Sequence, residues 1–348
     1  MDLFVIFFNL FYLKLIILIS YITMKINSED TTAEIQKLKP NLKINSIKQY
    51  ETHLKKLKKI FDSDNFDFLS KPDDVMDKLS ERHYTSQRNT LNAVIILLMA
   101  LNHDEKYNEL IEEYQKLRDQ RNAQYVEDQQ SGKISEKQSA NFVELKEVAK
   151  MMDEMAKEIK PLKHKTSLSG KEHELVTVYT MFNILTRIPL RNDLSGMKII
   201  TKANYKKLSD DDKKSTNYLV NEKTSMFFVL NEYKTSKKYG EKKIDIPKDL
   251  EKIIRAYLKI TGTKKGDDLF VNSQGNSITR NGISQMLLKT SKSRMGKNIS
   301  TTMLRKIVAS HHFGPDTEFG KLKEKQEELA DAMGHSVAVQ NQTYIKEK

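Results

Sequence analysis

Apolar residues between residues 36 and 126 recur mainly at helical spacing. In the stretch 47–61 they alternate with lysines, and Ser46 with Gln49 forms a capping-box pattern that opens a helix. Three further helices are predicted over residues 73–79, 85–101 and 109–125. The run 93–101 is apolar on every side, which is typical of a buried helix. We therefore predict a compact all-α module of four helices.

A polar stretch, residues 127–139, begins with EDQQSGKISEK and predicts a linker. In the remaining domain, 140–348, helices are predicted over residues 140–159, 171–186, 248–260, 279–292, 300–312, 322–333 and 337–345. Strands are predicted where β-branched and aromatic residues concentrate, at 197–201, 226–233 and 243–246. The hydrophilic insert 202–216 is expected to be a solvated loop between the first two strands. The expected fold class is mainly α with a small antiparallel β-sheet, an α+β domain that follows the helical module.

Residues 1–24 form an apolar segment. Leu3 to Thr23 is interrupted by two strongly polar residues, Asn9 and Lys14, and is long enough to span a bilayer. The charge of Lys14 costs roughly 3 kcal/mol in the hydrocarbon. Asp2 and the lack of a small-residue cleavage site argue against a secretory signal. Met24 then begins a polar stretch, so two alternatives stay open: a membrane anchor at 3–23, or translation from Met24.

The net charge changes this picture only modestly. The 348 residues include 59 Lys plus Arg against 47 Asp plus Glu, a net charge of +12. This balance favours a polyanionic partner, either nucleic acid or an anionic membrane surface, although a Lys-rich genome produces the same balance. Only ten of the basic residues are arginines, which excludes an arginine-rich RNA-binding tail and makes the position of each arginine informative.

Several kinds of chemistry have no motif in this chain. The absence of Cys excludes a disulfide scaffold, cysteine-ligated zinc, an iron–sulfur cluster and a thiol nucleophile. The eight His show no H-E-x-x-H spacing, and the adjacent His311 and His312 point in different directions from a helix. Neither a P-loop nor G-x-G-x-x-G nor G-x-S-x-G occurs. We expect neither a metal nor a cofactor.

Three cationic residues stand in positions suited to chemistry. Arg191 follows an apolar helix in LTRIPLRNDLSG. Lys234 stands at the end of a predicted strand that enters a basic hairpin, where Lys237 and Lys238 are alternatives to it. Arg305 lies one turn into a predicted helix, in TTMLRKIVASHH.

The C-terminal stretch LADAMGHSVAVQNQTYIK carries His335 and Tyr344 nine residues apart, with a helix break at Gly334 that lets the two side chains converge. The order Arg, Lys, Arg, Gly-His, Tyr resembles the tyrosine recombinase (phage-type integrase) family. The C-terminal stretch looks like the family's Leu-x-x-x-x-Gly-His box followed nine residues later by the tyrosine. LRKIVASHHF and RNDL resemble the boxes around the family's two arginines. The module at 36–126 is similar in size and position to the family's core-binding domain, and 140–348 to its catalytic domain.

The resemblance implies DNA cleavage without metal or ATP. Tyr344 would attack phosphorus to form a 3′-phosphotyrosyl link, while Arg191 and Arg305 stabilise charge on the phosphate oxygens. Lys234 would protonate the leaving 5′ oxygen, and His335 would hydrogen-bond the phosphate. Contacts with the DNA backbone are expected from Lys237, Lys238, Lys242 and Lys243.

The sequence departs from the family pattern in two places. Thr302 occupies the position, three residues before Arg305, where the family commonly has His or Lys. A hydroxyl is not a cationic acid, so proton transfer depends more heavily on Lys234. In addition, only four residues follow Tyr344, whereas relatives have a longer segment that docks onto the neighbouring protomer. We therefore expect a tetramer either to assemble through other surfaces or to be weak.

The implied function is a site-specific DNA recombinase, an integrase of a virus or mobile element, acting on double-stranded DNA as a homotetramer on paired sites. It would act inside the cell, in the host nucleus or cytoplasm, or in the virion, and at a membrane only if residues 3–23 are an anchor. Two alternatives stay open: a type IB topoisomerase-like enzyme, and a catalytically silent DNA-binding protein, membrane-tethered or not. No sequence pattern indicates the target site, the directionality or accessory factors.

Overall fold

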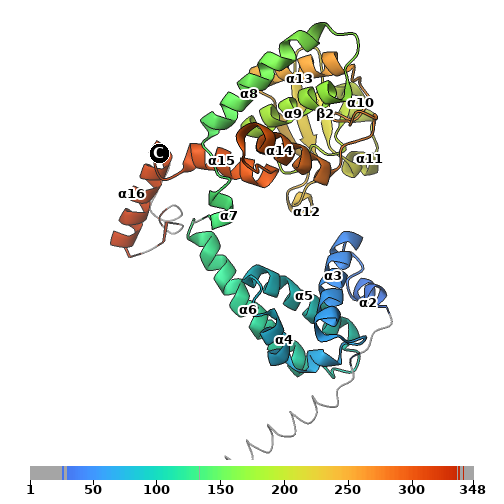
Figure 1. Ribbon diagram of the computed structural model, residues 1–348, viewed down its shortest axis with the longest axis vertical. Coiled ribbons are helices and arrows are strands. Elements are labelled where there is room, and N and C mark those ends of the chain that lie inside the picture. Colours follow the sequence, from blue (N-terminus) through green and yellow to red (C-terminus); the bar gives the residue numbers. More distant parts are fainter. Residues whose placement is uncertain (1–25, 27–29, 133, 335, 338–339, 341–348) are drawn as a thin grey trace, which may run out of the picture. The chain divides into compact units, whose positions relative to one another are not determined.

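A computed structural model of the protein describes residues 26, 30–132, 134–334, 336–337 and 340 (Figure 1). The chain divides into two compact units, 1–133 and 134–348, each with its own buried core. The division falls inside the stretch 127–139. We refer to the two as the N-terminal unit and the C-terminal unit.

The described residues of the N-terminal unit form helices and no strand. The helices are α2 (Thr31–Leu38), α3 (Ile44–Phe61), α4 (Pro72–Leu79), α5 (Tyr84–Leu101) and α6 (Asn108–Gln130), with a 3₁₀ turn at Asp67–Ser70. Four of them match the predicted helices, whereas α2 was not predicted. It is eight residues long and packs only Ile35 and the half-buried Leu38 on the core, so its apolar pattern is too short to predict a helix. Its start is fixed by the Asp30 carboxylate, which accepts hydrogen bonds from the N–H groups of Thr32 and Ala33.

Helix α5 lies at the centre of this unit. It packs against α2, α3 and α6, and most of its apolar side chains are fully buried. The predicted burial of the run 93–101 is therefore confirmed for most of its length, although Met99 is exposed. The core extends to Ile26 and Ile35, which precede the expected start of the module at residue 36.

The C-terminal unit contains most of the helices and the sheet. The helices are α7 (Glu136–Ser139), α8 (Leu145–Ile159), α9 (Gly170–Arg187), α10 (Lys202–Lys207), α11 (Asp210–Ser215), α12 (Ser236–Tyr239), α13 (Lys248–Thr261), α14 (Arg280–Met295), α15 (Thr301–Phe313) and α16 (Glu318–Ala332), with a 3₁₀ turn at Lys160–His164. Helix α9 begins at a capping box formed by Ser169 and Glu172, and it packs against α8, α13, α14 and α15. This burial makes α9 the central element of the unit.

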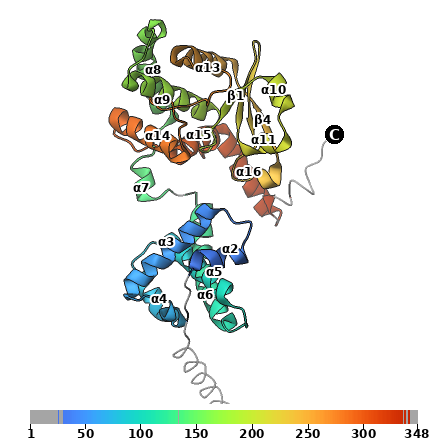
Figure 2. The ribbon, with the colours of Figure 1, turned by 90° about the vertical axis from the view of Figure 1, so that its right-hand side faces the viewer.

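The sheet has four strands in the order β1 (Lys198–Ile200), β2 (Tyr218–Asn221), β3 (Met226–Leu230) and β4 (Lys242–Asp245). The predicted fold class, mainly α with a small sheet, is confirmed. The sheet is mixed instead of antiparallel, because β1 pairs in parallel with β2, a strand that was not predicted. A parallel pair needs a crossover connection. Helices α10 and α11 supply it from the insert 202–216, which is largely exposed to solvent as expected but is helical and not a loop (Figure 2).

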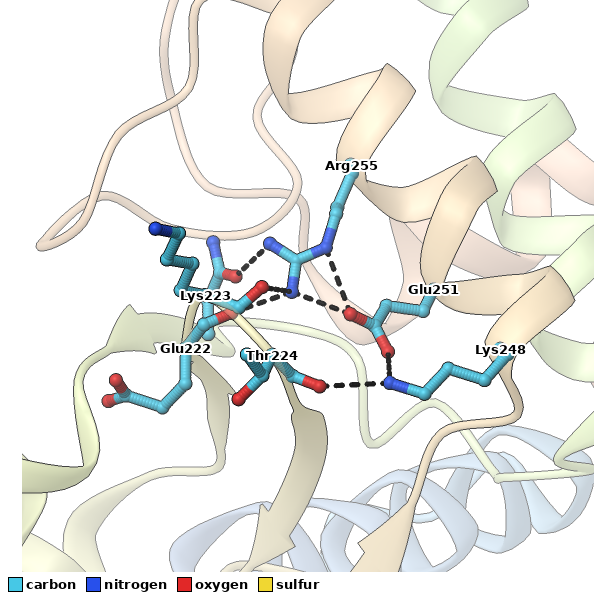
Figure 3. Close-up of polar contacts among 7 residues, drawn as sticks. Glu222, Lys223, Thr224, Lys248, Glu251 and Arg255 are labelled. Carbon is cyan, nitrogen blue, oxygen red and sulfur yellow. Dashed lines mark hydrogen bonds and ion pairs between the residues drawn. The ribbon is translucent and has the colours of Figure 1, made fainter.

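Hydrogen bonds and ion pairs from charged side chains of α13 hold the turn between β2 and β3 (Figure 3). The Glu251 carboxylate accepts from Nε and Nη2 of Arg255, at 3.0 and 2.6 Å, and from Nζ of Lys248 at 2.9 Å. Arg255 also donates to the backbone oxygen of Glu222 at 2.6 Å, and Lys248 to that of Thr224 at 2.9 Å. Both carboxylate oxygens of Glu251 accept hydrogen bonds from the two cations, and these cations also bind the backbone of the turn, so we interpret the cluster as structural.

Helix α16 is the last helix of the described residues. It ends at Ala332, and Gly334 has φ = +71°, so the predicted break of the helix before His335 is present. No helix within the described part of the chain is long and apolar enough to cross a membrane. The apolar segment 3–23 lies outside the described residues.

Candidate active site

Arg191 lies on a turn that directly follows α9. Leu190 and Leu194 anchor the turn in the core of the C-terminal unit, whereas Arg191 itself is exposed. Its guanidinium makes no hydrogen bond or ion pair with any residue that the structure describes. The fold thus holds the backbone at this position and leaves the cation accessible.

Asp193 is a carboxylate that the same turn buries among arginines. The residue is 4% exposed, and this burial raises its pKa above the ordinary value. The charges of Arg280, Arg191 and Arg305 oppose the rise, as does a hydrogen bond from the Arg191 backbone N–H. The Oδ1 atom is 3.6 Å from Nη1 of Arg280 and accepts no hydrogen bond from the described residues. The charges of three guanidiniums therefore act on one carboxylate, and Oδ1 accepts a hydrogen bond from none of them.

Arg305 reaches this position from α15. Ser300 caps the helix, and the apolar side of the helix, including Leu304 and Ile307, is buried in the core. The Nε atom of Arg305 donates to the backbone oxygen of Pro189 at 3.0 Å, across 116 residues of sequence. Because Pro189 is two residues before Arg191, the two predicted arginines are brought to the same turn.

Arg280 is a third cation of this cluster, and the sequence analysis missed it. It is the first residue of α14, and its Nη2 lies 3.3 Å from the backbone oxygen and 3.6 Å from the carboxylate of Glu232. The only local signal was Thr279, which caps α14. A cap indicates where a helix starts, but it does not indicate that the helix start faces Asp193.

Lys234 lies on an exposed turn that leads into α12, and the prediction that it stands at a strand end was wrong. Strand β3 stops at Leu230, because the next two N–H groups, of Asn231 and Glu232, donate to the side chain of Asn217. The Tyr233 hydroxyl donates to the backbone oxygen of Gly240 at 2.8 Å and closes the loop around α12. The Lys234 ammonium makes no hydrogen bond or ion pair within the described chain.

The four lysines predicted to contact DNA lie on this loop and on the strand that follows. All of them are exposed, on α12 and on β4: Lys237, Lys238, Lys242 and Lys243. The Lys242 ammonium is 5.1 Å from the ring centroids of both Tyr233 and Tyr239, and that of Lys243 is 3.2 Å from Asp245. Because β4 is an edge strand, charged side chains here also discourage pairing with another chain.

The remaining predicted residues are only partly described. Thr302 is exposed in the first turn of α15, and His311 is an exposed residue near its end, as expected of a helix residue. His335 and Tyr344 lie outside the described residues, together with most of the predicted helix 337–345. Over the described residues, no group of three or more His, Asp or Glu side chains could hold a metal ion.

Comparisons with known proteins add little to this geometry. No family model matches the chain, and no curated protein sequence matches it. Among solved structures, the crystal structure of XerA recombinase is similar over 91% of this chain and 94% of that chain, with 14% sequence identity and a TM-score of 0.32. At this TM-score the likeness supports neither a fold nor an activity.

Proposed function

We propose that the protein is a site-specific DNA recombinase that cuts and rejoins DNA through a 3′-phosphotyrosyl intermediate. The observation that supports this best is the gathering of Arg191 and Arg305 at one turn. Both were selected from the sequence order that ends in His335 and Tyr344. A phosphodiester in cleavage develops charge on its non-bridging oxygens, and two guanidiniums stabilise that charge with paired hydrogen bonds.

The proposed step conserves the energy of the phosphodiester. The Tyr344 oxygen forms a bond to phosphorus while the bond from phosphorus to the 5′ oxygen breaks. Lys234 gives its proton to the leaving 5′ oxygen, and the tyrosine proton passes to solvent. Religation reverses these bonds, so neither ATP nor a metal is needed for the balance. His335 would hydrogen-bond the phosphate.

The proposed partner is double-stranded DNA, bound by a homotetramer on paired sites. The exposed lysines of α12 and β4 support contact with the DNA backbone, and such contacts make affinity fall as salt rises. An integrase role in a virus or mobile element rests on the family resemblance of the sequence alone.

The experiment is the capture of a covalent adduct. A library of duplexes with random sequence, each nicked so that the cleaved fragment diffuses away, is incubated with the full chain and denatured. We expect a denaturation-resistant protein–DNA adduct that enriches one sequence, and we expect Tyr344→Phe to abolish it while DNA binding persists. The matched control is Tyr239→Phe, which removes the hydroxyl of an exposed tyrosine on α12.

Two other outcomes of this experiment would support the two alternative functions. Binding of an enriched sequence without any adduct would overturn the proposal in favour of a catalytically silent DNA-binding protein. Relaxation of supercoiled plasmid, with an adduct but without strand exchange between two recovered sites, would favour a type IB topoisomerase-like enzyme.

A further inference from the structure

Asn217 is a buried amide whose four hydrogen-bonding positions are all used. It is 1% exposed and directly precedes β2. Its Nδ2 donates to the backbone oxygens of Asp193 and Glu232, at 2.9 and 3.0 Å. Its Oδ1 accepts from the backbone N–H groups of Asn231 and Glu232, at 2.9 and 2.8 Å. An amide has two donor and two acceptor positions, so this side chain is fully committed to two backbone segments.

The two segments that Asn217 joins are those that carry the proposed chemistry. Asp193 is two residues after Arg191, and Glu232 is two residues before Lys234. Arg280 spans the same pair from outside, with Nη1 3.6 Å from the Asp193 carboxylate and Nη2 3.3 Å from the Glu232 backbone oxygen. Asn217 is therefore the buried half of a bridge between the Arg191 turn and the Lys234 turn.

The Lys234 turn depends on such attachments for its position. It begins where β3 ends, so ladder hydrogen bonds no longer hold it. At its far side, the Tyr205 hydroxyl donates to the Glu241 carboxylate and the Tyr233 hydroxyl to Gly240. At the near side the Asn217 amide makes the buried attachment, two residues from Lys234, and longer contacts from Arg280 to Glu232 and from the Asn231 side chain to Thr216 add to it.

We propose that Asn217 is a positioning residue that sets the Lys234 ammonium relative to Arg191 during strand cleavage; this inference rests on the proposed function. A general acid acts only within hydrogen-bond reach of the leaving oxygen, while the arginines fix the phosphate. Arg191 is held by the core through leucines on both sides, whereas the Lys234 turn has one neighbour in that core, Tyr233, and is otherwise held by polar contacts. Loss of the Asn217 amide is thus expected to displace the Lys234 ammonium more than the Arg191 guanidinium.

The test compares two leaving groups on the duplex recovered by adduct capture. One duplex has the natural 5′ oxygen at the cleaved bond, and the other has sulfur there. A thiolate leaves without being protonated, so the sulfur duplex does not need the general acid. Asn217→Ala is expected to slow cleavage of the oxygen duplex about 10- to 100-fold, and to cleave the sulfur duplex within about threefold of the unaltered protein. Lys234→Ala should show the same pattern with a larger loss.

The matched control is Asn221→Ala, on the other end of the same strand. Asn221 accepts a hydrogen bond from Arg255 at 3.0 Å, so its loss weakens the structure without touching the bridge. Any slowing in this variant should be equal on the two duplexes. An equal slowing of Asn217→Ala on both duplexes would overturn the inference while leaving the proposed function intact.

A second measurement does not require activity. Hydrogen exchange of the backbone amides of Asn231 and Glu232 should accelerate in Asn217→Ala, because the oxygen that accepts from both N–H groups is lost. It should accelerate less in Asn217→Ser, whose shorter side chain still carries an acceptor. Unchanged exchange at these two amides would also overturn the inference. If the unaltered protein forms no adduct on any duplex, the proposed function fails instead, and the exchange result alone reports on the bridge.

Discussion

The C-terminal unit holds two clusters of arginine and carboxylate that differ in how their charges are used. At Glu251, both carboxylate oxygens accept hydrogen bonds, and the same cations also hold the backbone of the β2–β3 turn. These hydrogen bonds, first those from Lys248 and then those from Arg255, lower the pKa of Glu251. The cluster is closed, because little of its hydrogen-bonding capacity remains for a ligand.

At Asp193 the balance is the opposite. Burial outweighs the surrounding cations, so the pKa of this carboxylate is raised although three arginines act on it. Its Oδ1 accepts no hydrogen bond, and the Arg191 guanidinium has no partner among the described residues. A buried anion can therefore hold cations nearby by charge without occupying their donors. We infer that unused hydrogen-bond donors, more than the number of charges, distinguish a cluster that is open to an anion from a closed structural one.

The largest expected effect is the loss of strand cleavage when an arginine of the open cluster is removed. Arg191→Ala and Arg305→Ala are each expected to lower the rate of adduct formation about 100- to 1,000-fold, as for other preorganised donors to a transition state. Arg305→Lys should be nearly as slow as Arg305→Ala, because an ammonium lacks the planar pair of donors of a guanidinium. The measurement is the single-turnover rate on the recovered duplex. Arg294→Ala, which removes an arginine already paired with Glu158, is the control and should retain the rate.

The next effect is on stability and belongs to the closed cluster. Arg255→Met leaves the buried Glu251 carboxylate with only Lys248 and is expected to lower the free energy of unfolding by about 1–3 kcal/mol. Urea unfolding followed by circular dichroism measures the change. In the double variant Glu251→Leu with Arg255→Met no carboxylate is left buried, so much of the stability should return. A single variant as stable as the unaltered protein would show that this cluster does not hold the turn.

The pH dependence of stability should have opposite signs in the two clusters. For Asp193, whose pKa is raised, the contribution to stability is full below 3.8 and is lost as pH rises through the raised pKa. For Glu251, whose pKa is lowered, the contribution is present above 4.5 and is lost as pH falls through the lowered pKa. Relative to the unaltered protein, Asp193→Asn should therefore gain stability as pH rises, and Glu251→Gln should lose it. Each slope is at most about 1.4 kcal/mol per pH unit, measurable by urea unfolding between about pH 3 and 7. If the stability difference changes with pH in the same direction for both variants, the two clusters do not differ in this way.

The smallest expected effect is at Glu172, a half-buried carboxylate near the surface whose oxygens accept hydrogen bonds from neighbouring residues. Hydrogen bonds from Lys165 and then from the backbone and hydroxyl of Ser169 lower its pKa to about 2. Its contribution is thus present above 4.5 and lost as pH falls through about 2. Glu172→Gln should lower the melting temperature slightly at neutral pH, and less in high salt, because solvent screens exposed charges. If the difference in melting temperature between Glu172→Gln and the unaltered protein does not depend on salt, the effect originates in the helix cap alone.

Local patterns sufficed for most of the helices and failed where contacts are distant. Helices with an apolar stripe, such as α9 and α13, were predicted within a residue or two, because burial of that stripe is what stabilises them. Strand β2 was missed, since its four residues gain their hydrogen bonds from β1 and β3 and have no alternating pattern of their own. Likewise Lys234 was placed at a strand end because nothing nearby in sequence reveals that Asn217 captures the next two N–H groups.

The candidate site divides along the same line. The sequence supplied five residues through the resemblance of their order and spacing to the tyrosine recombinase family, and they stay predictions: Arg191, Lys234, Arg305, His335 and Tyr344. The clustering of Arg191 with Arg305, the burial of Asp193, and the entry of Arg280 and Asn217 are properties of the fold. The physical reason is that charges and hydrogen bonds act over short distances in space, regardless of the separation in sequence. Only the packing of α9, α14 and α15 with the sheet brings those residues close enough to interact.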